Sequence, residues 1–567
     1  MLPRSPHPRR RRLRAAAAAL AAGAMLALSA CGANDPSRNT GAVGTDTGTQ
    51  APAAAGELQV LSSSNELNLD PAKSQSMAVT SLALVHRRLT TWRVEPGQEV
   101  EVVPDLATDT GTVSDDGLTW TYTLRDGLFF EDGTPITAAD IKYGLERTYA
   151  PALSGGLTYH RALLAGGEGY TGPYEGQHLD SIEVVDDSTI AFHLNQPAGD
   201  WPWIASTPAF SPVPEAQDDP ESYAREPVAS GPYRVASANV GVEVRLERNE
   251  YWSSDIDQMR TAEPDTIVWQ LGQDTQTTTQ RLLNDQPANA ISASLVPAST
   301  LAQLASDPAS QDRIVTSDPG PLQYLSINTE RVADVRVRQA INYAVNKAAV
   351  LIAMGGERGG AIATTYISPG IPGREEYALY GTEPEGDVAA AQALLDEAGV
   401  SSLDLVLLTR NDSDSVARSE AIAQGLSRVG INVTIDAVES ATFSERATQG
   451  DGSSYDLALG SWNPDYPSPN ANLRPLYHSA EIGQGGYNTS RYANPEVDAA
   501  IDAAAAEEDP EVAGPMWAAV DRMIAEDAPS VPLAFARNSF IGGSAVGNYY
   551  VEPFPAYPNY LVLSVEG

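Results

Sequence analysis

Residues 403–462 constrain the fold of this 567-residue chain most, because apolar runs alternate there with a helical pattern. In order, the segment predicts a strand at 403–408, a helix at 417–429 that ends at Gly430, and strands at 431–435 and 455–462. Strands separated by helices at this spacing form a parallel sheet that helices cover. The sequence therefore predicts that at least one part of the chain is α/β.

The N-terminus has the pattern of an export signal. Six arginines precede an apolar stretch at residues 15–30. At 1.5 Å per residue this stretch is too short for a hydrocarbon core of about 30 Å, so it predicts a signal peptide over residues 1–30. The stretch ends in Leu28-Ser29-Ala30-Cys31-Gly32, which resembles a lipobox.

Cys31 is the only cysteine in the chain, and we expect it to carry a lipid after cleavage. An ordinary secretory cleavage after Ala30, with Cys31 incidental, is the alternative. Residues 31–56 then comprise the lipidated cysteine and a flexible tether, because the segment lacks an apolar period and is rich in Gly, Thr, Ala and Pro. Such a tether reaches roughly 25–30 Å. The protein would be extracytoplasmic, anchored to the outer face of the cell membrane.

The charge of the chain limits its partners. The formal net charge is −38, and cleavage of the leader would make it more negative still. A nucleic-acid backbone requires a basic surface, so we expect no nucleic-acid partner.

Residues 115–147 carry a dense series of turns and one helix start. They comprise a turn at Asp115-Asp116-Gly117, a strand with Trp120, Tyr122 and Leu124 alternating, a turn at Asp126-Gly127, a returning arm at 128–130, a turn at Asp132-Gly133, and a capping box from Thr137 to Asp140. The interpretation from the residues alone is a hairpin packed on a helix, with nothing catalytic in it.

The string at 118–147 resembles the signature of the extracytoplasmic peptide-binding proteins of ABC importers, solute-binding protein family 5. Further segments resemble the family in the same order, at 104–107, 230–233, 248–252, 325–329, 334–341 and 387–399. The resemblance implies a periplasmic-binding-protein-like fold of type II, with two hinged α/β lobes plus an extra lobe. The implied boundaries are 57–87, 226–320 and 535–567 for lobe I, 88–225 for the extra lobe, and 321–534 for lobe II.

The resemblance also implies a binding site at Trp462-Asn463-Pro464-Asp465. In relatives the acid of this segment pairs with the α-ammonium of a peptide. A carboxylate in that role selects peptides without regard to their side chains. The alternative is that Asp465 only caps a turn beside Pro464. Trp462 and the backbone of Ser461 and Asn463 would flank an extended peptide, paired main chain to main chain.

The early loop at Ser74, Gln75 and Ser76 would supply backbone groups from the opposite side, unless it is only a surface loop. Some relatives have an arginine where this chain has Leu459, so the partner of a ligand carboxylate and the ligand length are not predicted. A non-peptide ligand such as an oligosaccharide, a nickel chelate or haem stays open, with Trp201 and Trp203 as stacking residues or core residues.

Other function classes find less support. The segment Gly167 to Gly172 fits Gly-x-Gly-x-x-Gly but follows no strand, and the five histidines after the leader are scattered. We therefore predict no cofactor, no metal site, no catalytic residue and no enzyme, with a secreted hydrolase or a sensory lipoprotein as lesser alternatives. The expected mechanism is hinge closure of a monomer on its ligand, recognised by a membrane ABC permease.

Overall fold

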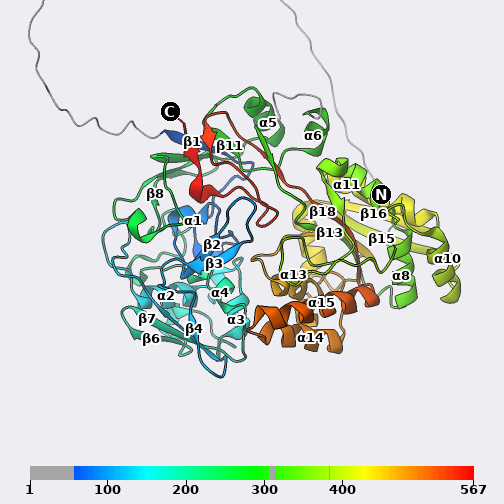
Figure 1. Cartoon of the computed structure of the whole chain (residues 1–567), viewed down its shortest axis with the longest axis horizontal. Helices are drawn as coiled ribbons and strands as arrows, with labels where there is room; N and C mark the ends of the chain where they lie inside the picture. The colour runs from blue at the N-terminus through cyan, green and yellow to red at the C-terminus, as the bar shows by residue number, and fades with distance from the viewer. Residues whose placement is uncertain (1–55, 305–312, 382, 484, 567) are drawn as a thin grey trace, which may run out of the picture. The chain divides into compact units, whose positions relative to one another are not determined.

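The computed structural model describes residues 56–304, 313–381, 383–483 and 485–566 (Figure 1). The predicted signal peptide, Cys31 and the predicted tether up to residue 55 lie outside these residues. Among the described helices, none combines the length and apolar character that a membrane span requires.

A five-stranded mixed sheet combines the first strand of the described chain with four strands from residues 233–292. Its order is β11-β1-β10-β9-β8, with β1 parallel to β10 and β11 and the other pairs antiparallel. The strands are β1 (Glu57–Leu61), β8 (Tyr233–Asn239), β9 (Glu243–Arg248), β10 (Thr266–Gln270) and β11 (Ala290–Ser292).

A four-stranded antiparallel sheet, β4-β5-β7-β6, lies beside helix α2 (Ala138–Arg147) (Figure 1). Its strands are β4 (Thr112–Val113), β5 (Thr119–Thr123), β6 (Ile182–Asp186) and β7 (Thr189–His193). The capping box is confirmed, since the Asp140 carboxylate accepts a 2.8 Å hydrogen bond from the Thr137 backbone N–H.

The predicted hairpin between the strand at Trp120 and residues 128–130 is wrong. The partners of β5 are β4 and β7, and Phe129 only bridges Pro135. Gly127 and Gly133 both take positive φ, so the chain turns twice and residues 128–136 close on themselves as a tight loop. The partner strand β7 comes from much later in the sequence.

A six-stranded mixed sheet has the order β14-β18-β13-β17-β15-β16. Its strands are β13 (Leu322–Ile327), β14 (Gly360–Ile362), β15 (Leu403–Arg410), β16 (Ile431–Val438), β17 (Leu457–Trp462) and β18 (Ser530–Ala536). The predicted strand–helix–strand pattern is confirmed, because β15 runs parallel to both β16 and β17. Helix α11 (Ser413–Ser427) begins before the predicted residue 417, since the Asp412 carboxylate caps it at the Ser415 N–H.

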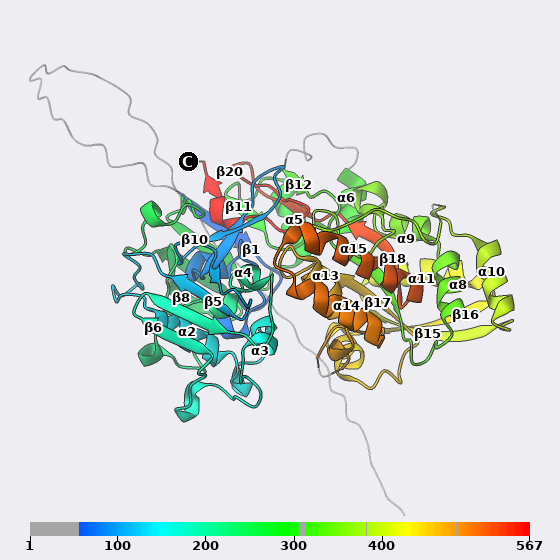
Figure 2. The same ribbon diagram turned by 60° about the horizontal axis from the view of Figure 1, so that its bottom comes forward.

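Helices α8 (Val335–Ala344), α10 (Val388–Glu397) and α11 contribute to one apolar core with this sheet (Figure 1). A second group, α13 (Pro469–Tyr477), α14 (Pro495–Ala506) and α15 (Pro510–Asp527), packs together near β17 (Figure 2). The remaining elements are α1 (Leu82–Val85), α3 (Tyr159–Leu163), α4 (Trp201–Ile204), α5 (Thr275–Leu283), α6 (Ala298–Leu304), α9 (Lys347–Ala353), α12 (Ser440–Ser444), β2 (Thr90–Arg93), β3 (Glu101–Pro104), β12 (Ile314–Thr316), β19 (Ser539–Ile541), β20 (Val546–Gly547) and β21 (Ser564–Val565). Short 3-10 turns lie between them, and a π-helical turn (Glu445–Gln449) follows α12.

Two segments cross between the five-stranded and six-stranded sheets and lie side by side. The Ala536 N–H donates to the Pro321 carbonyl at 2.7 Å, and the Ser317 N–H donates to the Asn538 carbonyl at 2.9 Å. The predicted lobe boundaries stay a prediction, because the described residues from 56 onward form one compact unit.

A buried ion cluster joins the predicted extra lobe to predicted lobe I. The Asp105 carboxylate binds Arg87 at 2.7 Å and Arg260 at 2.9 Å, and Arg260 also binds Asp257 at 3.0 Å. Each of these side chains is at most 2% exposed. Burial acts to raise the pKa of Asp105, but the Arg260 and Arg87 guanidiniums outweigh it and hold that pKa below its usual value.

Replacing Asp105 by Ala leaves two buried guanidiniums with only Asp257 as counter-charge. We expect a loss of about 3–5 kcal/mol in the free energy of unfolding, measured by urea denaturation. Glu101→Ala is the matched control, because it removes an exposed partner of Arg93 and should cost at most about 1 kcal/mol. Equal losses in the two variants would contradict a stabilising role for the cluster.

Candidate functional site

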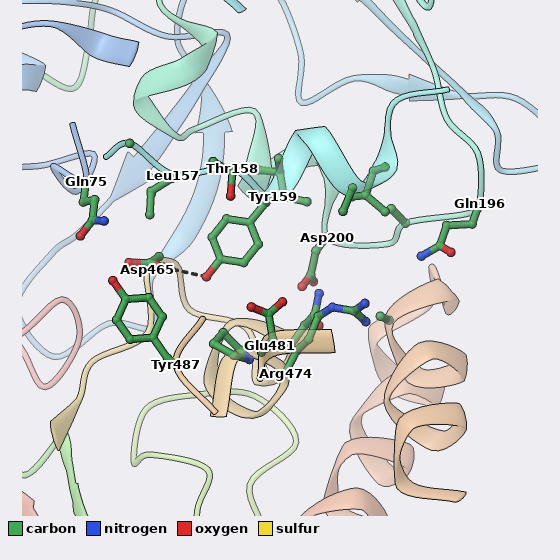
Figure 3. A pocket seen from close by; sticks show the side chains of 18 of the residues that line it. Gln75, Leu157, Thr158, Tyr159, Gln196, Asp200, Asp465, Arg474, Glu481 and Tyr487 are labelled. Carbon is green, nitrogen blue, oxygen red and sulfur yellow. Dashed lines mark hydrogen bonds between the residues drawn. The ribbon is translucent and has the colours of Figure 1, made fainter. Parts of the chain in front are cut away.

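The site is a cavity of about 250 Å³ between the segment around α3, the loop before α4, and the chain that follows β17 (Figure 3). Its lining includes Gln75, Leu157, Tyr159, Gln196, Asp200, Trp462, Asp465, Asn470, Arg474, Glu481 and Tyr487. The wall is therefore a mixture of aromatic rings and charged groups, from segments that lie far apart in the sequence.

Asp465 follows β17 directly, where the chain leaves the six-stranded sheet. The Tyr159 hydroxyl donates a 2.6 Å hydrogen bond to its carboxylate (Figure 3). Within the described residues no cation pairs with this carboxylate. Enclosure by protein raises the pKa of Asp465 to about 6, and the hydrogen bond from Tyr159 acts in the opposite direction. The arrangement leaves a negative charge in need of a cation.

Trp462 forms an apolar wall of the same cavity. Its indole N–H donates to the Ala471 carbonyl at 2.9 Å, which fixes the ring against the start of α13. The Tyr487 ring lies 5.1 Å from the Trp462 ring, tilted by 55°. Both rings line the cavity, and Tyr487 is still 41% exposed.

The structure brings three of the predicted site residues together at the cavity, namely Trp462, Asp465 and Gln75. Ser74, Ser76, Ser461 and Asn463 are not among the residues that line it. Ser461 is exposed on β17 opposite Gln323, and the Asn463 amide donates to the Pro555 carbonyl at 2.8 Å.

The early loop is held by its own hydrogen bonds. The buried Ser74 hydroxyl accepts from the Ser76 N–H at 3.1 Å, and the Ser76 hydroxyl lies 2.6 Å from that of Thr80. Leu459 is buried in β17 opposite Leu325, so this position cannot reach a ligand.

The lining residues that were not predicted from the sequence include Tyr159, Asp200, Asn470, Arg474, Glu481 and Tyr487. Arg474 and Glu481 follow the predicted Trp462–Asp465 segment closely, and that proximity was the one available signal. Tyr159 and Asp200 come from the predicted extra lobe, and no periodicity in the sequence connects them with Asp465. Only the tertiary fold reveals them.

No group of three or more His, Cys, Asp or Glu side chains is placed to hold a metal ion in the part of the chain that the structure describes. Trp201 is a core residue, fully buried and 5.5 Å from the Phe192 ring. It therefore cannot stack on a ligand.

Comparison with known proteins decides the family. Residues 101–484 match the family described as "Bacterial extracellular solute-binding proteins, family 5 Middle". The chain belongs to this family. Its members are solute-binding proteins of ABC importers, and the type II periplasmic-binding-protein fold predicted from the sequence is shown by the similar solved structures.

Three relatives illustrate the similarity. The glutathione-binding protein GsiB of Salmonella paratyphi A is 28% identical over 459 residues, which is 78% of this chain and 82% of the relative. The structure of "Clavulanic acid biosynthesis oligopeptide binding protein 2" has a TM-score of 0.84 at 30% identity, over 91% of this chain and 96% of that one. The Helicobacter pylori binding protein DppA, in complex with peptide STSA, has a TM-score of 0.71 at 22% identity, over 90% and 98%.

As a family 5 solute-binding protein, the chain is expected to close around its solute, and three contacts here join the predicted extra lobe to predicted lobe II. Tyr159 donates to Asp465, and the Ser468 hydroxyl donates to Asp200 at 2.6 Å. The Gly199 N–H donates to the Ala505 carbonyl at 3.1 Å. The cavity is therefore enclosed from both sides in this arrangement.

Asp465→Asn should stabilise the unliganded solute-binding protein at high pH. The raised pKa means that the folded state binds a proton more readily than the unfolded state, so this group favours folding more as the pH falls through about 6. At about pH 8 the variant should exceed wild type by about 1–2 kcal/mol in free energy of unfolding, because it keeps an acceptor for Tyr159 without the charge. The gain should vanish near pH 5, as measured by urea denaturation at both values.

Asp451→Asn serves as the control. Hydrogen bonds from Ser453 lower the pKa of this exposed carboxyl, so its replacement should give no gain at either pH. If wild type and Asp465→Asn had the same free energy of unfolding at high pH, the charge on Asp465 would not destabilise the folded state and the prediction would be wrong.

Proposed function

We propose that this protein captures short peptides by their free amino end, with Asp465 as the partner of the α-ammonium. The observation that carries the proposal is the Asp465 carboxylate, enclosed at the cavity with a neutral tyrosine donor and no cation among the described residues. An ammonium supplies the missing charge and up to three hydrogen-bond donors. The relatives support this ligand class, since they are named for binding glutathione or oligopeptides or were solved in complex with the peptide STSA.

Recognition of the remaining peptide would rest on contacts that tolerate many side chains. Trp462 and Tyr487 offer flat apolar faces, and Gln75 and Gln196 offer amides at the cavity wall. We also expect backbone groups near this wall to pair with the peptide, namely those of Ser74, Ser76, Ser461 and Asn463. This expectation rests on the family resemblance alone and stays a prediction.

Closure of the hinge links capture to transport. Peptide held by Asp465 from predicted lobe II also meets Tyr159 from the predicted extra lobe, so the closed form gains contacts from both sides. The permease of the importer then distinguishes the closed form from the open form. The protein acts as a monomer and a carrier, with no catalytic step.

The proposal includes anchoring of the chain to the outer face of the cell membrane through a lipid on Cys31. The single cysteine directly after the apolar leader supports it. The mass of the mature N-terminal peptide tests it, since an unmodified Cys31 or an intact leader would refute lipidation.

Asp465→Ala should abolish peptide binding while the fold stays intact. The ammonium would be desolvated without a partner, which weakens affinity by about 100-fold or more. Isothermal titration of wild type and variant with trialanine measures the loss, and circular dichroism checks the fold.

A change to the peptide's α-ammonium, the proposed partner of Asp465, gives the control. N-acetyl-trialanine lacks the positive charge and should bind wild type as weakly as free trialanine binds the variant. If the acetylated peptide bound wild type as tightly as the free one, recognition of the amino end by Asp465 would be refuted.

Gly199→Ala tests closure without touching the ligand. A Cβ at Gly199 would collide with the carbonyl oxygen of Glu507 across the contact between the predicted lobes. We expect peptide affinity to fall about tenfold, and the radius of gyration with peptide to stay larger than in wild type, measured by X-ray scattering. Gly514→Ala is the control, since its Cβ would meet only Gly373 Cα at 3.6 Å. An unchanged affinity in Gly199→Ala would contradict the closed arrangement.

A further inference from the structure

The cavity has more negative than positive side chains. Asp465, Asp200 and Glu481 line it, and Arg474 is the one cation among the described lining residues. Figure 3 shows Asp465 and Tyr487 on one side of the Tyr159 ring and Asp200, Glu481 and Arg474 on the other. A single ligand ammonium at Asp465 therefore leaves a second acidic region unoccupied.

Arg474 does not neutralise that second region by itself. Its guanidinium donates to Asp502, on α14, at 2.7 Å, and Asp502 is 49% exposed. The Glu481 carboxylate makes no hydrogen bond and no ion pair within the part of the chain that the structure describes. Burial raises the pKa of Glu481, with Arg474 and His478 acting in the opposite direction. The carboxylate thus loses water without gaining a direct partner.

Asn470 gives a second, independent sign of a missing donor. Its side chain is 8% exposed and lines the cavity, and its amide oxygen has no hydrogen-bond partner among the described residues. Nearby, Asp200 accepts from Ser468. A buried acceptor without a donor is rare in folded proteins and costs free energy unless a ligand satisfies it. What is missing on this side of the cavity is therefore an N–H-rich, positively charged group.

We propose that the preferred ligand is a peptide with a basic side chain, an arginine or a lysine, whose cationic head lies at Glu481 and Asn470 while its α-ammonium pairs with Asp465. The inference rests on the proposed function and adds the substrate class. A guanidinium or ammonium would pair with Glu481 and donate to the Asn470 amide oxygen.

A neutral peptide would not correct the charge balance. Its ammonium and carboxylate bring one charge of each sign, so the excess of carboxylates in the cavity remains. If its carboxylate were to take Arg474, it would compete with Asp502 for the same guanidinium. A basic side chain instead adds a net positive charge where the enclosed carboxylates need one.

The test is titration calorimetry with four probes, namely trialanine and the three tripeptides in which arginine replaces one alanine. Wild type should bind at least one arginine peptide about tenfold or more tightly than trialanine. In Glu481→Gln this ratio should fall toward one. Glu376→Gln, which removes an exposed carboxylate paired with Arg374, should keep the wild-type ratio.

The outcomes separate the two proposals. Equal wild-type affinity for all four peptides, each lost on N-acetylation, would overturn the basic-peptide inference and leave recognition of the amino end standing. An arginine preference that persists in Glu481→Gln would overturn the assignment of Glu481. Binding that is insensitive to N-acetylation would instead refute the proposed function.

Discussion

Enclosure of a carboxylate without a counter-cation is the constraint on which the rest of this site depends. Removing the water around Asp465 disfavours its charged form, and the Tyr159 hydroxyl compensates only in part. The same contact that encloses Asp465 also joins two parts of the chain that are 306 residues apart. Enclosure and charge are therefore linked, since the enclosed arrangement is costly for as long as the Asp465 carboxylate has no cation beside it.

Each side of the cavity is attached to a large part of the scaffold. β17 is a strand in the interior of the six-stranded sheet, paired with β13 and β15, so the chain that leaves it at Trp462 starts from a fixed point. On the other side, the cluster of Asp105, Arg87 and Arg260 ties the predicted extra lobe to predicted lobe I through buried ion pairs. Tyr159 and Asp200 are therefore attached to a large unit and are not on independent loops. In the proposed function, a charge captured at Asp465 would be converted into a motion of one unit relative to the other.

The sequence predicted the parts of this picture that depend on local pattern. Apolar periodicity is a local property of the sequence, so residues 403–462 predicted a parallel strand–helix–strand unit. A capping box is also local, so Asp140 predicted the start of a helix. The strand pairing around Trp120 was predicted wrongly, since adjacent turns favour a local hairpin while the real partner, β7, is distant in sequence. The position of Asp465 in the cavity was expected from a family resemblance, whereas Glu481 and Tyr159 carry no local pattern at all. Their roles arise from which segments the tertiary fold places together.

Under the proposed function, the distribution of partners around the cavity would also explain how one site is both selective and tolerant. Where the protein already satisfies a group, as with the Trp462 indole at the Ala471 carbonyl, a ligand gains only apolar contact and its identity matters little. Among the described residues, Asp465 and Glu481 have no paired cation and the Asn470 amide oxygen has no donor, so the ligand group that fits there would be determined by sign and by donor count. Selectivity is therefore concentrated at the atoms that the closed protein leaves unsatisfied, and the rest of the wall needs only to exclude water.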